Sequence, residues 1–269
     1  MIRTVPYIID TFPRVGHRKQ GSRMANPKLT STAKFQDVVP QANRLLAGLP
    51  EAELKRIQSD LTMVSLEVKE PLWVPNQPIE AVYFPIDVVV SVLAETDGGT
   101  VEVGTIGNEG VVGLPVFLGA NSFPGTAVAQ IPGRAHRMEA GAFHRAAQGG
   151  ELRSLVQRYT LGFLTQVSQG TACNRVHSAE QRLARWLLIV RDRVGRDSFP
   201  LTQEFMGQML GVRRATVSET ANALQSHGLI SYSRGTITIQ DVPGLTGTAC
   251  ECYQIVRDEF ERLLGTPMG

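Results

Sequence analysis

Apolar and polar residues alternate in the first half of the chain, and this two-residue period is that of β-strands. The alternation begins at residues 64–68, and four further short β-rich segments follow, at 82–84, 88–93, 101–103 and 127–131. Turn-forming pairs separate them, and Asp97-Gly98 between two β-rich segments is a hairpin signal. After a helical start at 41–60, many short strands at close spacing predict a β-sandwich or barrel.

The period changes to three and four residues near Met138, which predicts helix. We expect one long helix over residues 140–174, and its stripe consists of Leu152, Val156, Tyr159, Phe163 and Gly170. A stripe of this length can pack on its own domain or on a second copy of the chain. A second helix is expected at about 178–194, with leucines and a tryptophan on one side and arginines around the rest. Such arginines usually face solvent.

Residues 201–240 carry the pattern of a winged helix-turn-helix. Thr202 is the expected N-cap of a short helix, and Gly211 ends that helix in a left-handed conformation. A second helix follows with small and branched apolar residues on its inner side. Two alternating segments then flank Arg234-Gly235, which predicts a two-stranded wing with a basic tip.

The outer face of the second helix suits DNA, because a helix fits the major groove and its first residues reach base edges. Arg213 and Arg214 can offer guanidinium groups to guanine or charge to phosphate. Hydroxyl and amide groups near both helix N-termini can donate to phosphates. The residues that we expect to contact DNA on this reasoning are Thr202, Gln203, Arg213, Arg214, Thr216, Ser218, Asn222 and Arg234.

The charge distribution supports a polyanionic partner, although the net charge is only +2. Residues 1–40 and 174–240 are basic, whereas 41–173 and 241–269 are acidic. The basic first segment predicts a flexible tail, and Met24 is an alternative start that would remove residues 1–23. There is no apolar run of membrane-spanning length and no disulfide framework, so we expect a cytoplasmic protein without membrane contact.

Enzyme chemistry finds little support in the sequence. A metal-dependent cupin needs two or three histidines with a carboxylate on neighbouring strands, and residues 61–139 hold only His136. The Gly-rich segment 104–113 lacks the Lys-Ser/Thr of a phosphate loop. We therefore expect no enzymatic activity. The open alternative to DNA binding is a ligand-sensing or protein-interaction module that does not bind DNA.

Cofactor sites find little support either. An iron–sulfur cluster needs four thiolates, and the chain has three cysteines. Cys250 and Cys252, placed on a helix, would point about 200° apart, so they do not form a ready chelate with Cys173. Haem ligation by a histidine such as His144 or His177 has no second feature to support it. We expect no metal and no cofactor.

The chain resembles the Crp/Fnr family of bacterial transcription regulators over about residues 41–264. The resemblance is strongest in LTQEFMGQMLGVRRATVSETANALQSHGLI and the wing SYSRGTITI, and extends to EAVYFPIDVVVSVL and VGTIGNEGVVGLPVFLGANSFPGTAVAQI in the β region. After the tail at 1–40, it implies an α+β fold with these parts: a cyclic-nucleotide-binding-like eight-stranded jelly roll at 41–139, a dimerisation helix at 140–174 and a winged helix-turn-helix domain at 175–264. The implied partners are double-stranded DNA, RNA polymerase and a second copy, with the stripe as dimer seam.

The second helix of the helix-turn-helix is the recognition helix of the family, and its sequence departs from that of the best-known members. Their recognition helix opens with Ser-Arg-Glu-Thr-Val. Arg214 and Thr216 match that pattern, but Ala215 stands where the family has its base-reading Glu. Glu219 stands where the family has a second Arg. Its carboxylate could accept a hydrogen bond from a cytosine amine or face solvent, so it joins the expected DNA-contacting residues. The family's common operator half-sites should not be assumed.

The effector site departs further. Nucleotide-binding members hold ribose and phosphate with a Gly-Glu pair and then an Arg-Ser or Arg-Thr pair. The aligned pairs here are Gly113-Leu114 and Gly125-Thr126, so both charged residues are missing. Glu109-Gly110 offers another Glu-Gly step nearby. Because a lost charge-assisted pair costs several kcal/mol of affinity, we expect no usual cyclic AMP binding, and the effector stays unknown.

Overall fold

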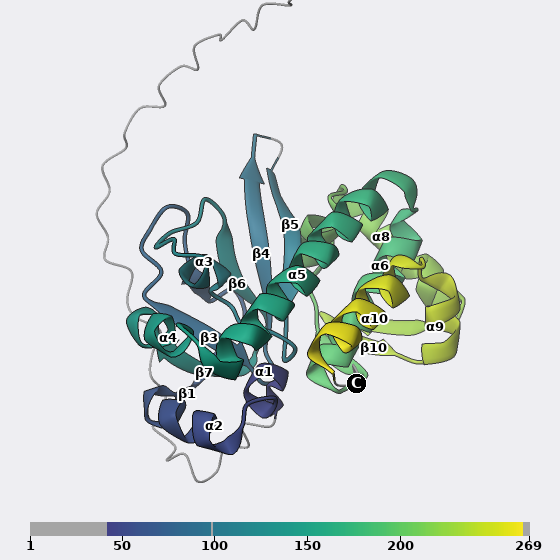
Figure 1. Ribbon diagram of the computed structural model, residues 1–269. Helices are drawn as coiled ribbons and strands as arrows, with labels where there is room; N and C mark the ends of the chain where they lie inside the picture. The colour runs from purple at the N-terminus through teal and green to yellow at the C-terminus, as the bar shows by residue number, and fades with distance from the viewer. Residues whose placement is uncertain (1–41, 98, 266–269) are drawn as a thin grey trace, which may run out of the picture.

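The computed structural model describes residues 42–97 and 99–265. The expected tail at 1–40 and the alternative start at Met24 lie outside the described residues. Figure 1 shows a β domain, a long helix that crosses the molecule, and a mainly helical C-terminal domain with a small sheet. Among the described helices, none has the length and apolar character needed to cross a membrane.

Two short helices and a single 3₁₀ turn precede the β domain: α1 (Arg44–Ala47), α2 (Glu51–Ile57) and η3 (Gln58–Asp60). Asn43 caps α1 through its side chain, which accepts from the backbone N–H groups of Leu45 and Leu46. Pro50 is the N-cap of α2 and holds an extended conformation (ψ 142°). The helical stretch predicted over 41–60 therefore consists of two helices, because the helical conformation is disfavoured at the residue before a proline.

Seven strands form the β domain over the part of the chain that the structure describes. They are β1 (Thr62–Leu66), β2 (Pro71–Trp73), β3 (Ala81–Pro85), β4 (Val89–Thr96), β5 (Gly99–Ile106), β6 (Thr126–Ile131) and β7 (Gly133–Glu139). One sheet has the order β1-β7-β3, and the other has the order β2-β6-β4-β5. All pairings are antiparallel, and Thr96 pairs with Gly99, which confirms the predicted hairpin. The eighth strand implied by the resemblance is not formed among these residues.

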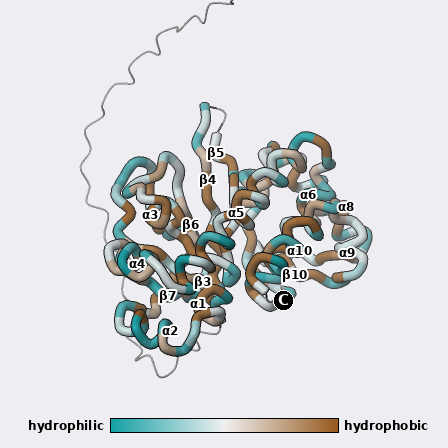
Figure 2. Tube along the Cα trace, viewed as in Figure 1, coloured by the Kyte–Doolittle hydropathy of each residue, from teal (hydrophilic) through white to brown (hydrophobic). Residues whose placement is uncertain are grey.

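The core of the β domain lies where the apolar faces of the strands meet. Val82, Phe84, Val90 and Ala129 are wholly buried. Figure 2 shows the hydrophobic stretches along β4 and β6. A short helix, α3 (Leu114–Phe117), follows β5 and begins at Gly113, which has a φ of 132°. The period-two pattern therefore identified this part of the chain correctly as β structure.

The predicted helix over 140–174 is two helices, α4 (Ala140–Ala146) and α5 (Gly150–Val176). The break covers residues 147–149, and Gly150, the first residue of α5, has a φ of 74° that favours glycine. The Glu53 carboxylate accepts from the backbone N–H groups of Glu151 (3.0 Å) and Leu152 (2.9 Å). A negative charge at a helix N-terminus is stabilising, so α2 helps to fix the start of α5.

The C-terminal domain begins with α6 (Ala179–Val194), which Ser178 and Gln181 start with a capping box. The other helices are α7 (Gln203–Leu210), α8 (Arg214–Ser226), α9 (Val242–Thr248) and α10 (Cys252–Leu264). The strands are β8 (Ser198–Pro200), β9 (Ile230–Ser233) and β10 (Thr236–Ile239), in the order β8-β10-β9. Helix α10 returns to lie along α5, as Figure 1 shows.

The predicted dimer seam needs correction. Leu152, Val156 and Tyr159 are wholly buried inside one chain, and the Tyr159 ring stacks on Phe260 of α10 at 6.0 Å between centroids. Phe163 packs against the β5 backbone at Gly104. The stripe follows the period of a helix, and most of it packs on its own chain.

Candidate nucleic-acid interface

The helix-turn-helix forms as predicted. Thr202 caps α7, and its hydroxyl accepts from the backbone N–H of Phe205 at 3.3 Å. Gly211 ends α7 with a φ of 61°, in the left-handed region that glycine adopts most readily. Seven apolar side chains of the two helices are buried together, namely Phe205, Met206, Met209, Leu210, Val217, Ala221 and Leu224. This packing fixes the orientation of α8 relative to α7.

Most of the predicted DNA-contacting residues lie at the surface. Exposed are Thr202, Arg213, Arg214, Glu219, Asn222 and Arg234, whereas Gln203, Thr216 and Ser218 are half-buried. Arg214 Nε donates to Gln203 Oε1 at 2.9 Å, and Ser218 Oγ donates to the Arg214 carbonyl at 3.2 Å. Arg213 is the N-cap residue of α8 and leaves its side chain outside the helix. The two arginines therefore stand at the N-terminal end of α8, the end that enters a major groove.

The wing is also present. β9 and β10 pair with Ser233 opposite Thr236, and the turn between them holds Arg234 (φ 51°) and Gly235 (φ 77°). Positive φ at both turn positions is the hairpin geometry that matches the twist of two strands. Gln225 Oε1 accepts from the backbone N–H of Tyr232 at 2.8 Å, which ties α8 to the wing. Arg234 is thus held at the tip, beside the recognition helix.

An open cleft of about 1020 Å³ separates the helix-turn-helix from the β domain. Thr100 and Val101 of β5 line one wall, and Arg213 and Arg214 line the other. Near the cleft, Lys69 Nζ lies 2.5 Å from a carboxylate oxygen of Glu204 on α7. The β hairpin therefore stands next to the DNA-reading face of the same chain.

A buried polar cluster joins α6 to the β domain and α5, and sequence reasoning did not find it. Arg193 forms a two-point ion pair with Glu109, at 2.7 and 3.0 Å, and its Nη2 also donates to Gln166 at 2.7 Å. The arginines of α6 were expected to face solvent, and this is wrong for Arg193. Arg193 follows much the same helical spacing as the other arginines of α6, so the sequence pattern does not distinguish it from them. Its role becomes visible only from its contact with the buried Glu109.

Glu102 of β5 belongs to the same interface. Its carboxylate accepts hydrogen bonds from Ser91 (2.5 Å), Thr105 (2.8 Å) and Trp186 of α6 (3.0 Å). Burial raises the pKa of this carboxyl, and the three hydrogen bonds oppose that rise. A hydrogen bond from an indole N–H to a carboxylate therefore connects the C-terminal domain to the sheet.

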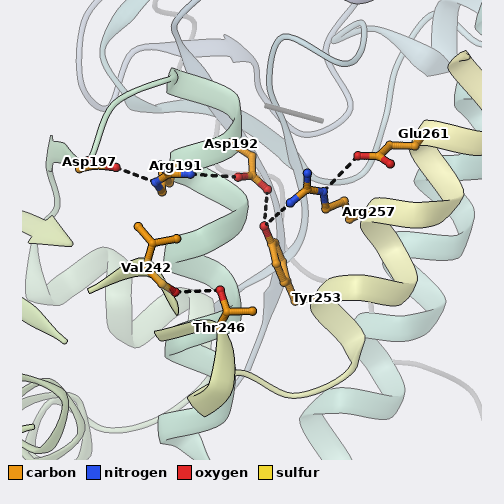
Figure 3. A network of polar contacts seen from close by, with 8 residues as sticks. All are labelled: Arg191, Asp192, Asp197, Val242, Thr246, Tyr253, Arg257 and Glu261. Atoms are coloured by element: carbon orange, nitrogen blue, oxygen red, sulfur yellow. Dashed lines mark hydrogen bonds and ion pairs between the residues drawn. The ribbon is translucent and has the colours of Figure 1, made fainter. Parts of the chain in front are cut away.

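A second polar network, inside the C-terminal domain, connects α6 to α10 (Figure 3). Tyr253 donates its hydroxyl proton to Asp192 at 2.8 Å, and Arg257 donates to the Tyr253 oxygen at 3.3 Å and to Glu261 at 3.1 Å. Burial, followed by the charge of Asp192, raises the pKa of Tyr253 to about 12. Because α10 also packs on α5, this network links the closing helix to the DNA-reading domain.

The candidate effector residues occupy separate structural positions. Glu109 is engaged with Arg193, and the Cβ that an alanine would add at Gly110 meets the Tyr159 ring at 2.2 Å. Gly113 and Leu114 stand at the start of α3. The Gly125 carbonyl accepts a hydrogen bond from the Trp73 indole N–H, and Thr126 begins β6. The cleft beside β5 and a smaller cavity between β5, α5 and α6 are lined by none of these residues.

The three cysteines gather in one buried cluster with His177, contrary to the expected separation. Cys173 Sγ lies 3.5 Å from Cys250 Sγ, and Cys252 Sγ lies 3.6 Å from His177 Nδ1. The expectation that Cys250 and Cys252 point apart assumed one helix. Cys250 instead lies in the extended connection before α10, so its side chain can turn toward Cys252. The Cys173 and His177 pair, four residues apart at the end of α5, is the signal that could have indicated this cluster.

The comparisons with known proteins agree with this geometry. Residues 181–247 match the family model of the Crp-like helix-turn-helix domain. No curated protein sequence matches the chain.

Three solved structures share the fold. FixK2 from Bradyrhizobium japonicum is 19% identical with a TM-score of 0.60, over 71% of this chain and 98% of that chain. A CRP-family transcriptional regulator of Thermus thermophilus is 19% identical with a TM-score of 0.58, over 77% and 98%. A putative Crp/Fnr-family regulator of Eubacterium rectale is 18% identical with a TM-score of 0.59, over 77% and 98%. The chain therefore carries a Crp-like helix-turn-helix domain at residues 181–247 and shares its overall fold with these transcriptional regulators.

Proposed function

We propose that the protein is a homodimeric regulator of transcription that reads double-stranded DNA with α8 and touches phosphate with the wing. The observation that carries the proposal is the exposed pair Arg213 and Arg214 at the N-terminal end of α8, on a helix whose opposite face is buried. Guanidinium groups in this position can reach guanine edges or phosphates. Arg234 at the wing tip adds a further cation on the same domain.

The exposed face of α5 supports the homodimer. Its outward residues recur at intervals of three and four, and they are Arg153, Gln157, Leu161, Leu164, Ser168, Thr171 and Arg175. This is the spacing of a seam between two helices. Leu161 and Leu164 stand at its centre and are exposed in the single chain. A two-fold pair of α8 helices would meet half-sites about one DNA turn, roughly 34–36 Å, apart.

The mechanism that we infer is a movement of the C-terminal domain relative to α5 and the β domain. In the present arrangement Arg213 and Arg214 share a cleft with β5, and near it Lys69 of the β domain pairs with Glu204 of α7. In a state with a wider cleft, a larger part of the α8 surface would be accessible to DNA. A ligand or partner that binds one arrangement better would shift the balance between the two. RNA polymerase is the partner that the resemblance implies for a bound regulator.

The effector domain, we infer, does not bind cyclic AMP in the usual way. Leu114 and Gly125 stand where nucleotide-binding members have Glu and Arg. A Cβ at Gly125 would lie 2.4 Å from the Leu93 carbonyl oxygen, so the backbone here leaves no room for an arginine. The nearby Glu109 is already paired with Arg193. These contacts support an effector of different chemistry or none.

The test of DNA binding is a gel-shift selection on genomic fragments, at several salt concentrations, with the wild type and the double variant Arg213→Ala/Arg214→Ala. We expect the variant to lose binding, because the phosphate and base contacts of α8 are removed. The matched control, Lys55→Ala/Arg56→Ala, removes two exposed cations from α2 in the N-terminal part and should bind as the wild type does. If the wild type binds no DNA even at low salt, the module without DNA binding is favoured instead.

A further inference from the structure

Four side chains at the junction of α5 with the C-terminal domain have the composition and spacing of a metal site. The ligand atoms of Cys173, His177, Cys250 and Cys252 all lie within 4.8 Å of one another. In a tetrahedral zinc site, bonds of about 2.3 Å to sulfur and 2.0–2.1 Å to nitrogen place two sulfurs about 3.8 Å apart, and a sulfur and a nitrogen about 3.6 Å apart. The observed separations, 3.5 Å between the sulfurs of Cys173 and Cys250 and 3.6 Å between Cys252 Sγ and His177 Nδ1, agree with these values.

The surroundings of the four residues are those of a metal site as well. His177 would bind through Nδ1, and its other ring nitrogen, Nε2, lies 3.2 Å from the Glu251 carboxylate. A carboxylate on the second nitrogen of a ligating histidine is the usual way in which its ring is oriented. Gln169 Nε2 lies 3.1 Å from Cys252 Sγ, so an amide N–H also supports one sulfur.

Positive charge lies close to the thiols. Arg185 interacts electrostatically with Cys173, and Arg182 interacts electrostatically with both Cys173 and Cys250. The Nε atoms of both arginines are buried without a hydrogen-bond partner. Three thiolates around one Zn²⁺ carry a net charge of −1, and two neighbouring guanidinium groups would balance it.

We propose that Cys173, His177, Cys250 and Cys252 bind one Zn²⁺ in a closed, structural Cys₃His site. All four positions of a tetrahedral ion are taken by protein ligands, and the cysteines are buried, so no position is left for substrate or water. Thiolate and imidazole ligands in this geometry select zinc over the hard cations Mg²⁺ and Ca²⁺. The site goes beyond the proposed DNA binding and does not depend on it.

The position of the site indicates what the ion does. Cys173 and His177 close the C-terminal end of α5, and His177 is followed at once by Ser178, the N-cap of α6. Cys250 lies in the connection from α9 to α10, and Cys252 is the first residue of α10. A bound ion would therefore join two segments about 75 residues apart, at the point where the C-terminal domain could turn relative to α5. Zinc would hold this junction in one arrangement.

The experiment measures metal in the full-length protein, purified without chelator. Elemental analysis should find one zinc per chain, and Co²⁺ added to chelator-stripped protein should produce thiolate-to-cobalt charge transfer and the visible bands of tetrahedral Co²⁺. Stripping the metal should lower the midpoint of thermal unfolding, and Zn²⁺ should restore it. Cys250→Ser and His177→Gln should each weaken zinc retention at least 10-fold, whereas the control His144→Gln, an exposed histidine on α4, should not.

Several results would overturn the proposal. The first is a folded wild type that holds no zinc and takes up neither Zn²⁺ nor Co²⁺. The second is a cluster that holds iron, or one in which two of the three thiols of fresh protein are oxidised. The third is zinc retention in His177→Gln equal to that of the wild type. This last variant stays informative if Cys250→Ser fails to fold, because the His177 side chain is 14% exposed and forms no part of the apolar core.

Discussion

Arg193 on α6 and Glu109 after β5 form an ion pair that is almost completely buried, with side chains 1% and 0% exposed. Glu109 also accepts from the backbone N–H of Gly107, and Arg193 also donates to Gln166 of α5. The pair therefore connects three parts of the molecule: the sheet, the long helix and the first helix of the DNA-reading domain. Since two buried charges must be held together, the pair favours one relative position of these parts.

Removing Arg193 should destabilise the protein strongly. Arg193→Ala leaves the Glu109 carboxylate buried without its partner, which typically costs about 3–5 kcal/mol of unfolding free energy. Lys55→Ala is the control, because Lys55 pairs with the exposed Glu51 on α2 and such pairs are worth about 0–1 kcal/mol. Thermal and urea unfolding compare the two variants. If both variants lost the same small amount of unfolding free energy, the buried pair would not be what holds the domains together.

Glu102 should give the stability a distinct pH dependence. Its pKa in the folded protein lies above the ordinary value of 4.5 because burial disfavours the charged form. The folded state keeps this proton to higher pH than the unfolded state, so the contribution is present below about pH 4.5 and lost as pH rises through the folded pKa. Glu102→Gln cannot titrate, and the stability of the wild type relative to the variant should therefore fall as pH rises through this window.

The measurement is the midpoint of thermal unfolding of both proteins at a series of pH values from about 4 upward, which brackets the ordinary carboxyl pKa. Above the folded pKa of Glu102 the difference between the two curves should become constant. Curves that stay parallel over the whole series would contradict the assignment of a raised pKa to Glu102.

Local patterns predicted much of this fold because they act over a few residues. Gly211 and Thr202 end and begin α7 as expected, since a left-handed C-cap and a hydroxyl N-cap depend only on the neighbouring backbone. The split between α4 and α5 was not predicted, although the apolar stripe begins only at Leu152. Two glycines in succession, Gly149 and Gly150, are the local signal for this break.

Contacts between distant segments could not be predicted in the same way. The stripe of α5 was correct in period, but whether Tyr159 faces a second copy or its own chain depends on Phe260, about 100 residues away. The same holds for Cys173 and Cys250, which meet only because α10 returns along α5. Periodicity identifies the buried face of a helix and leaves its partner open.

Two glycines of α5 should respond to alanine in opposite ways. A Cβ at Gly162 would lie 2.7 Å from the Phe260 ring, so Gly162→Ala should push α10 outward and cost about 1–3 kcal/mol. Gly170→Ala meets nothing within 4 Å and should gain about 1 kcal/mol from the better helix propensity of alanine. Unfolding midpoints of both variants test this, and a Gly162→Ala protein as stable as the wild type would contradict the packing of α10 on α5.

Cyclic AMP should show no micromolar binding. The two charged groups that usually hold its phosphate and ribose are replaced by Gly125 and Leu114, and Glu109 is occupied by Arg193. Isothermal titration of the full-length protein with cyclic AMP measures this directly. A second titration, with Arg193→Ala, tests whether a freed Glu109 makes any difference. Micromolar affinity in the wild type would contradict the prediction.

Dimerisation should depend on the exposed centre of α5. Leu164 is 59% exposed in the single chain, and Leu161 lies beside it on the same face. Leu164→Glu puts a negative charge on each side of a two-fold seam. The two glutamates would repel each other, and the apolar contact between the leucines would be lost. The variant should run as a monomer in size-exclusion chromatography with light scattering and should bind operator fragments more weakly. Leu118→Glu, at a leucine 67% exposed on the β domain, is the matched control and should stay dimeric. A dimeric Leu164→Glu protein would place the seam on a different surface.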